Sequence, residues 1–280
     1  MKRALALILA LVMTMALVAC GGDKPTSSTP DKSATTSTPT EPSKPSEPEK
    51  PAEPEKPAEP KILKISQAAA AANAWGAVAQ NSADLEIQDK ISGTLYKVLP
   101  IDGKAVLSPL MAAGEPVDVN GDGKTWNITV SDKAMFENGE KITADTFMYT
   151  FKMALDPKLV FPKASGVGSN YITVVNGAAY YNQGQEGKTP VAWEDVGFKK
   201  VDEMTFQVTC ENAVTKELVM RHFSSRLTTP VYQPLFEQCL SADGTTSTYG
   251  SSQDKIISSG PFKLTNWVIG SVREYEKNEN

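Results

Sequence analysis

Histidine and cysteine are scarce in this sequence of 280 residues, which contains one histidine and three cysteines. His222 has no second histidine to work with, and Cys20, Cys210 and Cys239 form no C-x-x-C pair. Zinc sites and Ser-His or Cys-His catalysis depend on these residue types, so the sequence contains too few of them to favour a zinc site or either kind of catalysis. We therefore predict no catalytic residue, no metal site and no cofactor, and we expect the protein not to be an enzyme.

The same few residues leave two questions of structure open. We expect His222 to be a hydrogen-bonded interior residue or a surface residue rather than a general base. Cys210 and Cys239 lie 29 positions apart, and in an exported protein they could form a disulfide. Two buried free thiols fit the sequence equally well.

Clustered positive charge is also missing. The 28 lysines and arginines are scattered among 33 acidic residues, and the formal net charge is −5. A protein that binds nucleic acid is expected to gather basic residues on one face. We predict no nucleic-acid partner.

The start of the chain has the pattern of an export signal. Two basic residues, Lys2 and Arg3, precede an apolar run from Ala4 to Ala19 that is rather short for a membrane-spanning helix. This pattern is typical of a secretory signal peptide, which we place at residues 1–19.

The end of that run predicts a lipid anchor. The string Leu17-Val18-Ala19-Cys20 resembles the lipobox of bacterial lipoproteins, which implies cleavage before Cys20 and lipidation, for example with palmitate, of that residue. Because each buried lipid methylene contributes about 0.8 kcal/mol, a multiply acylated cysteine holds a protein on the membrane. The alternative is an ordinary signal peptide followed by an incidental cysteine. We expect a protein anchored by lipid to the extracytoplasmic face of the cell membrane.

Apolar side chains are absent from the next segment. Residues 23–60 contain ten of the 19 prolines and no aromatic residue, Ile, Leu, Val or Met. Such a segment has nothing to bury and favours extended polyproline II, so we predict a disordered tether over residues 20–60. A spacer role and a merely tolerated insertion both fit, and we prefer the spacer. The remaining 220 residues are enough for one large domain or two modest ones.

The body of the chain mixes both kinds of secondary structure. Alternating or short apolar runs predict strands at residues 61–66, 98–101, 105–107, 126–130, 198–201, 204–209, 230–232, 262–267 and 272–276. Helical spacing predicts helices at 85–96, 144–155, 216–223 and 234–240, the first capped by Ser82 or Asp84 and the second by Thr143. Asp102-Gly103 indicates a hairpin turn, and residues 68–79 fit a helix or a loop. The class is mixed α and β without the regular alternation of a barrel.

One short motif suggests a cation site. Residues 118–123 have the D-x-N-x-D-G spacing of a calcium-binding loop, but Thr129 occupies the twelfth position, where a bidentate glutamate is required. A turn between strands accounts for the same residues, and we prefer it. The following Gly123-Lys124-Thr125 is not a phosphate-binding loop, because Asp118 replaces the first required glycine.

Several segments together resemble a known family. They are Trp126-Asn127-Ile128-Thr129-Val130, Phe136-Glu137-Asn138-Gly139-Glu140-Lys141-Ile142-Thr143-Ala144-Asp145-Thr146-Phe147, Leu155-Asp156-Pro157, Val201 to Val208, Thr229-Pro230-Val231 and Ser259-Gly260-Pro261-Phe262-Lys263-Leu264 with Trp267. Their order and spacing over most of residues 61–280 are similar to those of the oligopeptide/dipeptide class of ABC-importer solute-binding proteins.

This resemblance implies a function and partners. It implies a mixed α/β, two-lobed, periplasmic-binding-protein-like (class II) fold that closes on a peptide ligand and catalyses nothing. The implied partners are a membrane permease and its separate cytoplasmic ATPases. A receptor for another solute, such as a nickel complex or an oligosaccharide, is the alternative within this architecture. A degenerate or adhesive surface lipoprotein is the alternative outside it.

The sequence departs from the family in length. Members usually continue for about 250 residues beyond the Gly260 segment, as an ordinary further domain would, whereas this chain stops 20 residues after Gly260. The resemblance therefore implies most of a first ligand-binding lobe, residues 61–95 and 196–280, and an inserted smaller domain, residues 96–195. It implies that the second lobe is missing.

Candidate ligand-binding residues follow only from the resemblance. In the family, the loop between the first strand and the first helix lines the ligand cleft, and its positional match here includes Trp75, Asn81, Ser82 and Asp84. Tyr171 matches a position where the chain returns toward the first lobe. A role in the hydrophobic core is an equally good interpretation of Trp75 and Tyr171.

Overall fold

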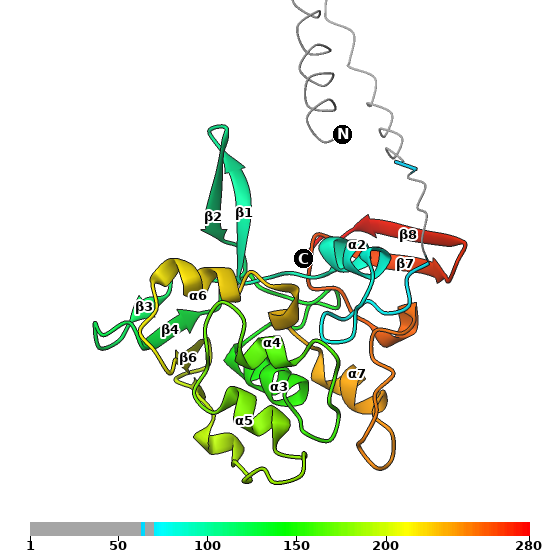
Figure 1. Ribbon diagram of the computed structural model, residues 1–280. Coiled ribbons are helices and arrows are strands. Elements are labelled where there is room, and N and C mark those ends of the chain that lie inside the picture. Colours follow the sequence, from blue (N-terminus) through cyan, green and yellow to red (C-terminus); the bar gives the residue numbers. More distant parts are fainter. Residues whose placement is uncertain (1–62, 65–69) are drawn as a thin grey trace, which may run out of the picture. The chain divides into compact units, whose positions relative to one another are not determined.

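The computed structural model describes residues 63–64 and 70–280, and Leu63–Asn280 form one compact unit (Figure 1). The predicted signal peptide, the lipidated Cys20, the tether and most of the strand expected at 61–66 lie outside the described residues. No helix among the described residues is long and apolar enough to cross a membrane.

The helices of the described part are short. They are α2 (Ser82–Ile91), α3 (Ala144–Ala154), α4 (Ser165–Gly168), α5 (Gly177–Asn182), α6 (Lys216–His222) and α7 (Gln233–Gln238), with 3₁₀ turns η1 (Trp193–Asp195), η2 (Arg226–Thr228) and η3 (Gln253–Lys255). Thr143 precedes α3 as predicted, and its N–H donates to the Thr146 hydroxyl at 3.1 Å. Asp156-Pro157 follows α3, where proline prevents a further turn.

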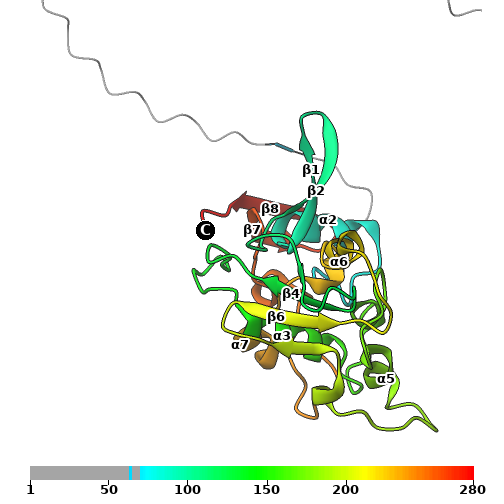
Figure 2. The same cartoon turned by 90° about the vertical axis from the view of Figure 1, so that its left-hand side faces the viewer.

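The strands form three separate antiparallel sheets. A four-stranded sheet has the order β3 (Val117–Asp118), β4 (Thr125–Thr129), β6 (Thr205–Thr209) and β5 (Phe198–Lys200). Two hairpins complete the set: β1 (Tyr96–Ile101) with β2 (Lys104–Pro109), and β7 (Phe262–Val268) with β8 (Val272–Lys277). The hairpin predicted from Asp102-Gly103 is confirmed, and it projects from the unit (Figures 1 and 2). The strands predicted at 198–201 and 204–209, and at 262–267 and 272–276, also form antiparallel pairs.

The main core lies between α3 and the four-stranded sheet (Figure 2). Phe147 and Phe151 lie four positions apart on the apolar face of α3, so both point at the sheet. The Phe151 ring lies 4.4 Å from the Phe198 ring, and the Phe147 ring lies 5.4 Å from the Phe206 ring, measured between centroids. Burying aromatic rings of this size supplies much of the free energy that favours folding.

A second, smaller core joins α2 to β7. Ile87 and Ile91 of α2 pack with Leu264 of β7 and three buried alanines. Gly260 makes this contact possible, because a Cβ on it would lie 2.8 Å from the Ile91 carbonyl carbon. The N–H groups of Ser259 and Gly260 both donate to the Ile91 carbonyl at 2.8 Å. The segment 259–260 therefore fixes the end of α2.

Three local predictions are corrected. The first helix ends at Ile91 rather than residue 96, and Tyr96 instead begins β1. Its cap is Asn81, whose side chain accepts the N–H of Asp84 at 2.9 Å, whereas Ser82 and Asp84 lie inside the helix. Residues 230–232 form no strand, because the Val231 N–H donates to the Thr150 hydroxyl of α3 instead of to a neighbouring strand.

The predicted division into a first lobe and an inserted domain stays a prediction. Its boundary at residues 195/196 falls within continuous structure, because β4 from the expected smaller domain pairs with β6 from the expected lobe. The main core likewise contains residues from both sides of the boundary.

Candidate functional site

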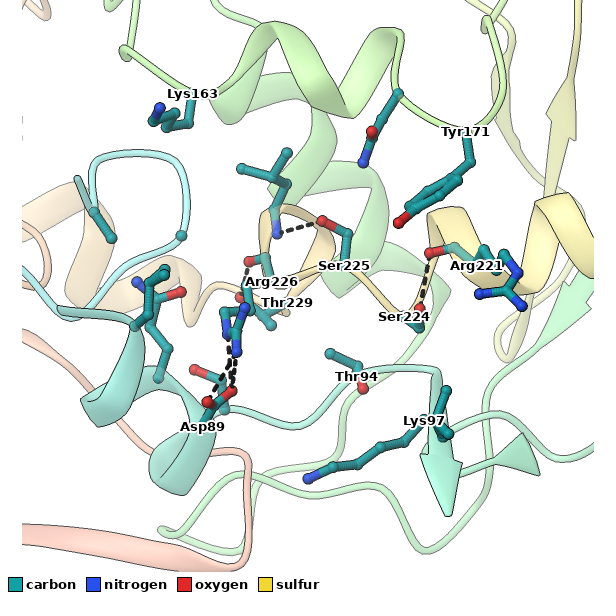
Figure 3. A pocket seen from close by; sticks show the side chains of 18 residues that line it. Asp89, Thr94, Lys97, Lys163, Tyr171, Arg221, Ser224, Ser225, Arg226 and Thr229 are labelled. Atoms are coloured by element: carbon teal, nitrogen blue, oxygen red, sulfur yellow. Dashed lines mark hydrogen bonds and ion pairs between the residues drawn. The ribbon is translucent and has the colours of Figure 1, made fainter. Parts of the chain in front are cut away.

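A hollow of about 510 Å³ lies on one side of the described unit (Figure 3). We refer to it as the hollow. Four stretches of chain contribute side chains to it: residues 76–98, Lys163, residues 170–171 and residues 221–229. They bring together the loop before α2, the exposed side of α2, the start of β1, and the segment joining α6 to η2.

Close backbone contacts hold these walls together. A Cβ on Gly76 would lie 2.1 Å from the Arg226 carbonyl oxygen, so only glycine lets the two walls approach this closely. The Lys163 N–H donates to the Ala77 carbonyl at 3.0 Å and ties a third wall to the same loop.

The wall carries four cationic side chains and one acidic side chain. Arg226 forms a bidentate salt bridge with Asp89. Its Nε donates to Oδ1 at 2.8 Å, and its Nη2 donates to Oδ2 at 2.8 Å. Arg221 pairs with Glu217 on its own helix, with Nη2 2.7 Å from Oε1. Lys97 and Lys163 make no ion pair with any described residue.

A buried amide also borders the hollow. The Gln88 side chain is 1% exposed, and neither its amide nitrogen nor its amide oxygen has a hydrogen-bond partner among the described residues. An unpaired buried polar group is costly, and both amide atoms are covered in the structure, so the Gln88 side chain must turn toward the hollow before a ligand can pair with it.

Of the five predicted ligand-binding residues, one lines the hollow. Tyr171 is 48% exposed and points into the space opposite α2 (Figure 3), so the alternative core interpretation of this residue is wrong. Trp75 is buried, and its ring meets the edges or faces of Phe161, Phe236 and Tyr249 at centroid distances of 4.7, 5.4 and 5.7 Å. Its core interpretation is therefore confirmed.

The remaining predicted residues organise the loop before α2. Asn81 and Ser82 are exposed at the start of the helix. Asp84 is buried, and its carboxylate accepts the N–H groups of Ala72, Asn73, Gln80 and Asn81 at 2.7 to 3.2 Å. Burial acts to raise the pKa of Asp84, but these four hydrogen bonds outweigh it and hold the pKa below the ordinary value.

The other motifs singled out from the sequence form internal contacts. The Asp118 carboxylate accepts the N–H groups of Gly121 and Gly123 at 3.0 and 2.7 Å, so the preferred turn is confirmed. Within the part of the chain that the structure describes, no three His, Cys, Asp or Glu side chains gather as a metal site would require.

His222 and the two later cysteines are interior residues. His222 is fully buried, with Nε2 3.1 Å from the Val167 carbonyl oxygen, and burial lowers its pKa to about 4 despite that hydrogen bond. Cys210 and Cys239 are free and buried, which decides between the two possibilities left open by their spacing. Burial raises the pKa of the Cys210 thiol to about 11.

The sequence reasoning missed Gln88, Lys97, Lys163 and the arginines of the hollow. A signal did exist for Gln88, because it shares the buried stripe of α2 with Ala83, Ile87 and Ile91. A polar residue on an apolar stripe is unusual and invites a functional explanation. The lysines carry no such local signal, because they become neighbours only in the fold.

Residues 106–280 match a family described as bacterial extracellular solute-binding proteins, family 5 Middle. The matching segment covers more than half of the chain.

Curated relatives agree with this match. The chain is 31% identical to a dipeptide-binding protein of Lactococcus lactis subsp. cremoris over 152 residues, which are 54% of this chain and 24% of the relative. It is 31% identical over 172 residues to the dipeptide-binding protein DppE of Bacillus subtilis, covering 61% of this chain and 28% of the relative. The chain thus spans about a quarter of the length of these relatives.

Solved structures share the fold. Listeria monocytogenes OppA bound to peptide matches with a TM-score of 0.64 at 22% identity, over 79% of this chain and 40% of that one. The pheromone receptor PrgZ matches with a TM-score of 0.63 at 23% identity, over 76% of this chain and 38% of the receptor chain. The expected fold class, that of the two-lobed solute-binding proteins, is confirmed for the part that matches. The chain belongs to the family 5 bacterial extracellular solute-binding proteins.

Proposed function

We propose that this protein is the extracytoplasmic solute-binding component of an ABC importer and that its ligands are dipeptides or oligopeptides. It delivers them to a membrane permease driven by separate cytoplasmic ATPases and catalyses no reaction. Family membership supports this proposal, and so do relatives named for dipeptide and oligopeptide binding. The observation that carries it is the hollow, whose 510 Å³ lies in the size range of small-ligand sites, about 300–1,000 Å³.

The chemistry of the hollow suits a peptide. A peptide presents alternating N–H and C=O groups, and the lining includes the Gln88 amide and the hydroxyl groups of Ser224 and Ser225. The Ser224 hydroxyl already donates to the Arg221 carbonyl, so it can accept a ligand N–H. Tyr171 adds an aromatic ring that can pack on a ligand side chain. We propose that Tyr171 contacts the ligand, and that Trp75, Asn81, Ser82 and Asp84 act by holding the wall in place.

The proposal includes the anchor and the domain plan. Residues 1–19 are removed as a signal peptide, Cys20 is lipidated, and residues 20–60 tether the protein to the extracytoplasmic face of the membrane. Residues 61–95 and 196–280 belong to the first lobe, with residues 96–195 inserted as a smaller domain. The lipobox-like string and the proline-rich composition support the first part.

Peptide titration tests the binding role. Isothermal titration of the full chain with dipeptide and oligopeptide pools is expected to give saturable heat. Tyr171→Ala should weaken binding by about fivefold, which corresponds to the loss of roughly 1 kcal/mol of aromatic contact. Phe262→Ala is the matched control, because Phe262 is 41% exposed and lies outside the hollow. Absence of heat with every pool, or equal effects of the two variants, would contradict the proposal.

Metabolic labelling tests the anchor. Labelled fatty acid is expected to enter the wild type and a Cys239→Ser control but not Cys20→Ser. The membrane fraction should lose Cys20→Ser at the same time. Equal labelling of all three proteins would exclude Cys20 as the lipidated residue.

A further inference from the structure

The charges on the wall of the hollow do not balance. Asp89 is the one acidic side chain among the lining residues, and the Arg226 guanidinium already neutralises it through two hydrogen bonds. Arg221 is paired with Glu217. Lys97 and Lys163 are the cations left over, and Figure 3 shows them at two ends of the hollow.

This imbalance favours one sign of ligand charge. An ammonium group without a local counter-ion attracts a carboxylate, and the attraction is stronger in a concave site than on an open surface. A ligand lysine or arginine would instead meet like charges, and like charges brought together across an interface reduce affinity.

Gln88 supplies a neutral group to the lining of the same hollow. Its amide has one accepting oxygen and a donating nitrogen, both buried at the hollow and both unpaired among the described residues. In an extended ligand, the N–H and C=O of one residue point to the same side, whereas the two groups of a single trans peptide unit point in opposite directions. A ligand residue that met the Gln88 amide with both groups would satisfy its nitrogen and its oxygen at once and remove the cost of leaving them unpaired.

Building on the proposed peptide-binding role, we propose that the hollow selects ligands that carry a carboxylate beside a peptide unit. Lys97 at one end of the hollow, or Lys163 at the other, attracts the carboxylate, and Gln88 hydrogen-bonds the ligand backbone. The carboxylate can belong to an acidic side chain or to the carboxyl terminus of the peptide, since the amines distinguish only charge.

Matched peptides test the selection. The full chain is titrated with Ala-Glu-Glu-Ala, Ala-Gln-Gln-Ala and Ala-Lys-Lys-Ala, each with a free and with an amidated carboxyl terminus. The glutamate peptide is expected to bind at least about fivefold more tightly than the lysine peptide, with the glutamine peptide between them. The amidated series identifies the source of the carboxylate. A preference for the glutamate peptide over the lysine peptide comes from side chains, whereas recognition of the terminal carboxylate appears as weaker binding of all three peptides after amidation.

Lysine variants test the assigned residues. Lys97→Gln with Lys163→Gln should reduce the glutamate-to-lysine affinity ratio to near one, whereas Lys188→Gln, an exposed lysine away from the hollow, should leave the ratio unchanged. The wild-type ratio should also decrease with added salt, because salt screens exposed charges.

Gln88→Leu separates ligand recognition from folding. It removes two unpaired buried polar atoms, so the variant should be at least as stable to heat as the wild type. It should nevertheless bind all three peptides about tenfold more weakly, with the charge ratio retained.

The outcomes distinguish the two proposals. Equal affinity for all three peptides that also does not change on amidation overturns the charge selection and leaves the peptide-binding role intact. No binding of any peptide overturns both. Unchanged affinity in Gln88→Leu removes Gln88 from the site.

Discussion

Four backbone N–H groups converge on the carboxylate of Asp84, and this single side chain closes the loop of residues 72–81 on α2. The loop contributes Gly76 to the hollow, so the Asp84 carboxylate helps to position that wall. The direct ligand contact that the resemblance implies for Asp84 stays a prediction.

Asp84→Asn should therefore reduce stability. The amide keeps the shape of the carboxylate but loses accepting capacity and faces N–H groups with its own donors. We expect a loss of about 2 kcal/mol in the free energy of unfolding, measured with urea. Asp202→Asn is the control, because the exposed Asp202 carboxylate accepts two backbone N–H groups that water can also satisfy. Equal losses in the two variants would contradict this account.

His222 should make stability depend on pH. Burial lowers its pKa to about 4 in the folded protein, below the ordinary 6.5 expected in the unfolded chain. Between these values the unfolded chain binds the proton and the folded protein does not, so stability falls as the pH falls. The loss should reach about 3 kcal/mol between pH 6.5 and 4.

Replacing the imidazole tests this explanation. His222→Gln keeps a donor for the Val167 carbonyl but does not titrate, so its free energy of unfolding should change less over the same pH range. Urea unfolding at several pH values measures both proteins. Parallel pH profiles would show that other groups cause the dependence.

At the scale of elements, the β1–β2 hairpin depends on its two-residue turn. Asp102 and Gly103 both have positive φ, 49° and 72°, as in the tight turns that match the twist of paired strands. A Cβ on Gly103 would meet no atom within 4 Å, so substitution there adds backbone strain and no steric clash.

Gly103→Ala should loosen the hairpin by about 1 kcal/mol, which corresponds to roughly fivefold faster amide hydrogen exchange in β1 and β2. Gly114→Ala is the control, because it also has free space around the added Cβ but its φ is not positive. Exchange in the hairpin should not change in the control. If both variants exchanged alike, the turn conformation would not be the cause.

Elements with strong local signals were predictable. The hairpin turn, the apolar face of α3 and the paired strands each follow from short-range spacing or turn residues. The end of α2 was not, because Leu95 and Tyr96 continue the apolar spacing beyond the helix. The chain leaves the helix before Gly93, where a Cβ would lie 2.3 Å from Met111 Sδ and 2.6 Å from the Ser259 carbonyl oxygen. Contacts between such distant segments leave no local pattern.

The same reason limits prediction of the site. Its walls come from residues between 76 and 229, so no short window of sequence contains it. Tyr171 was found by resemblance alone, whereas Gln88 was detectable as a polar residue on a buried helical stripe. Lys97 and Lys163 are ordinary exposed lysines until the fold brings them to one hollow.

At the scale of the whole molecule, the core crosses the predicted domain boundary. Phe147 and Phe151 from the expected inserted domain pack on Phe198, Phe206 and Phe223 from the expected lobe. Two domains that share this much buried apolar surface are expected to unfold together, because unfolding either one exposes the core of the other.

We therefore expect residues 63–280 to unfold in one heat-induced transition, with calorimetric and van't Hoff enthalpies that agree. Phe151→Ala should lower the transition temperature, since truncating a buried phenylalanine costs about 3–5 kcal/mol, and the single transition should remain. Two resolved transitions in the wild type would show instead that the predicted lobe and inserted domain are independent.

The burial of Cys210 and Cys239 has a practical consequence for following ligand binding in solution. A thiol that is buried, as both are, reacts slowly with maleimides, and the raised pKa of Cys210 leaves little thiolate to react. A cysteine introduced at an exposed position that has no proposed role in binding, such as Val98 at the rim of the hollow, would then be the main target for a fluorophore in a chain that lacks Cys20. One dye beside the hollow would report peptide occupancy optically without removal of the native interior cysteines.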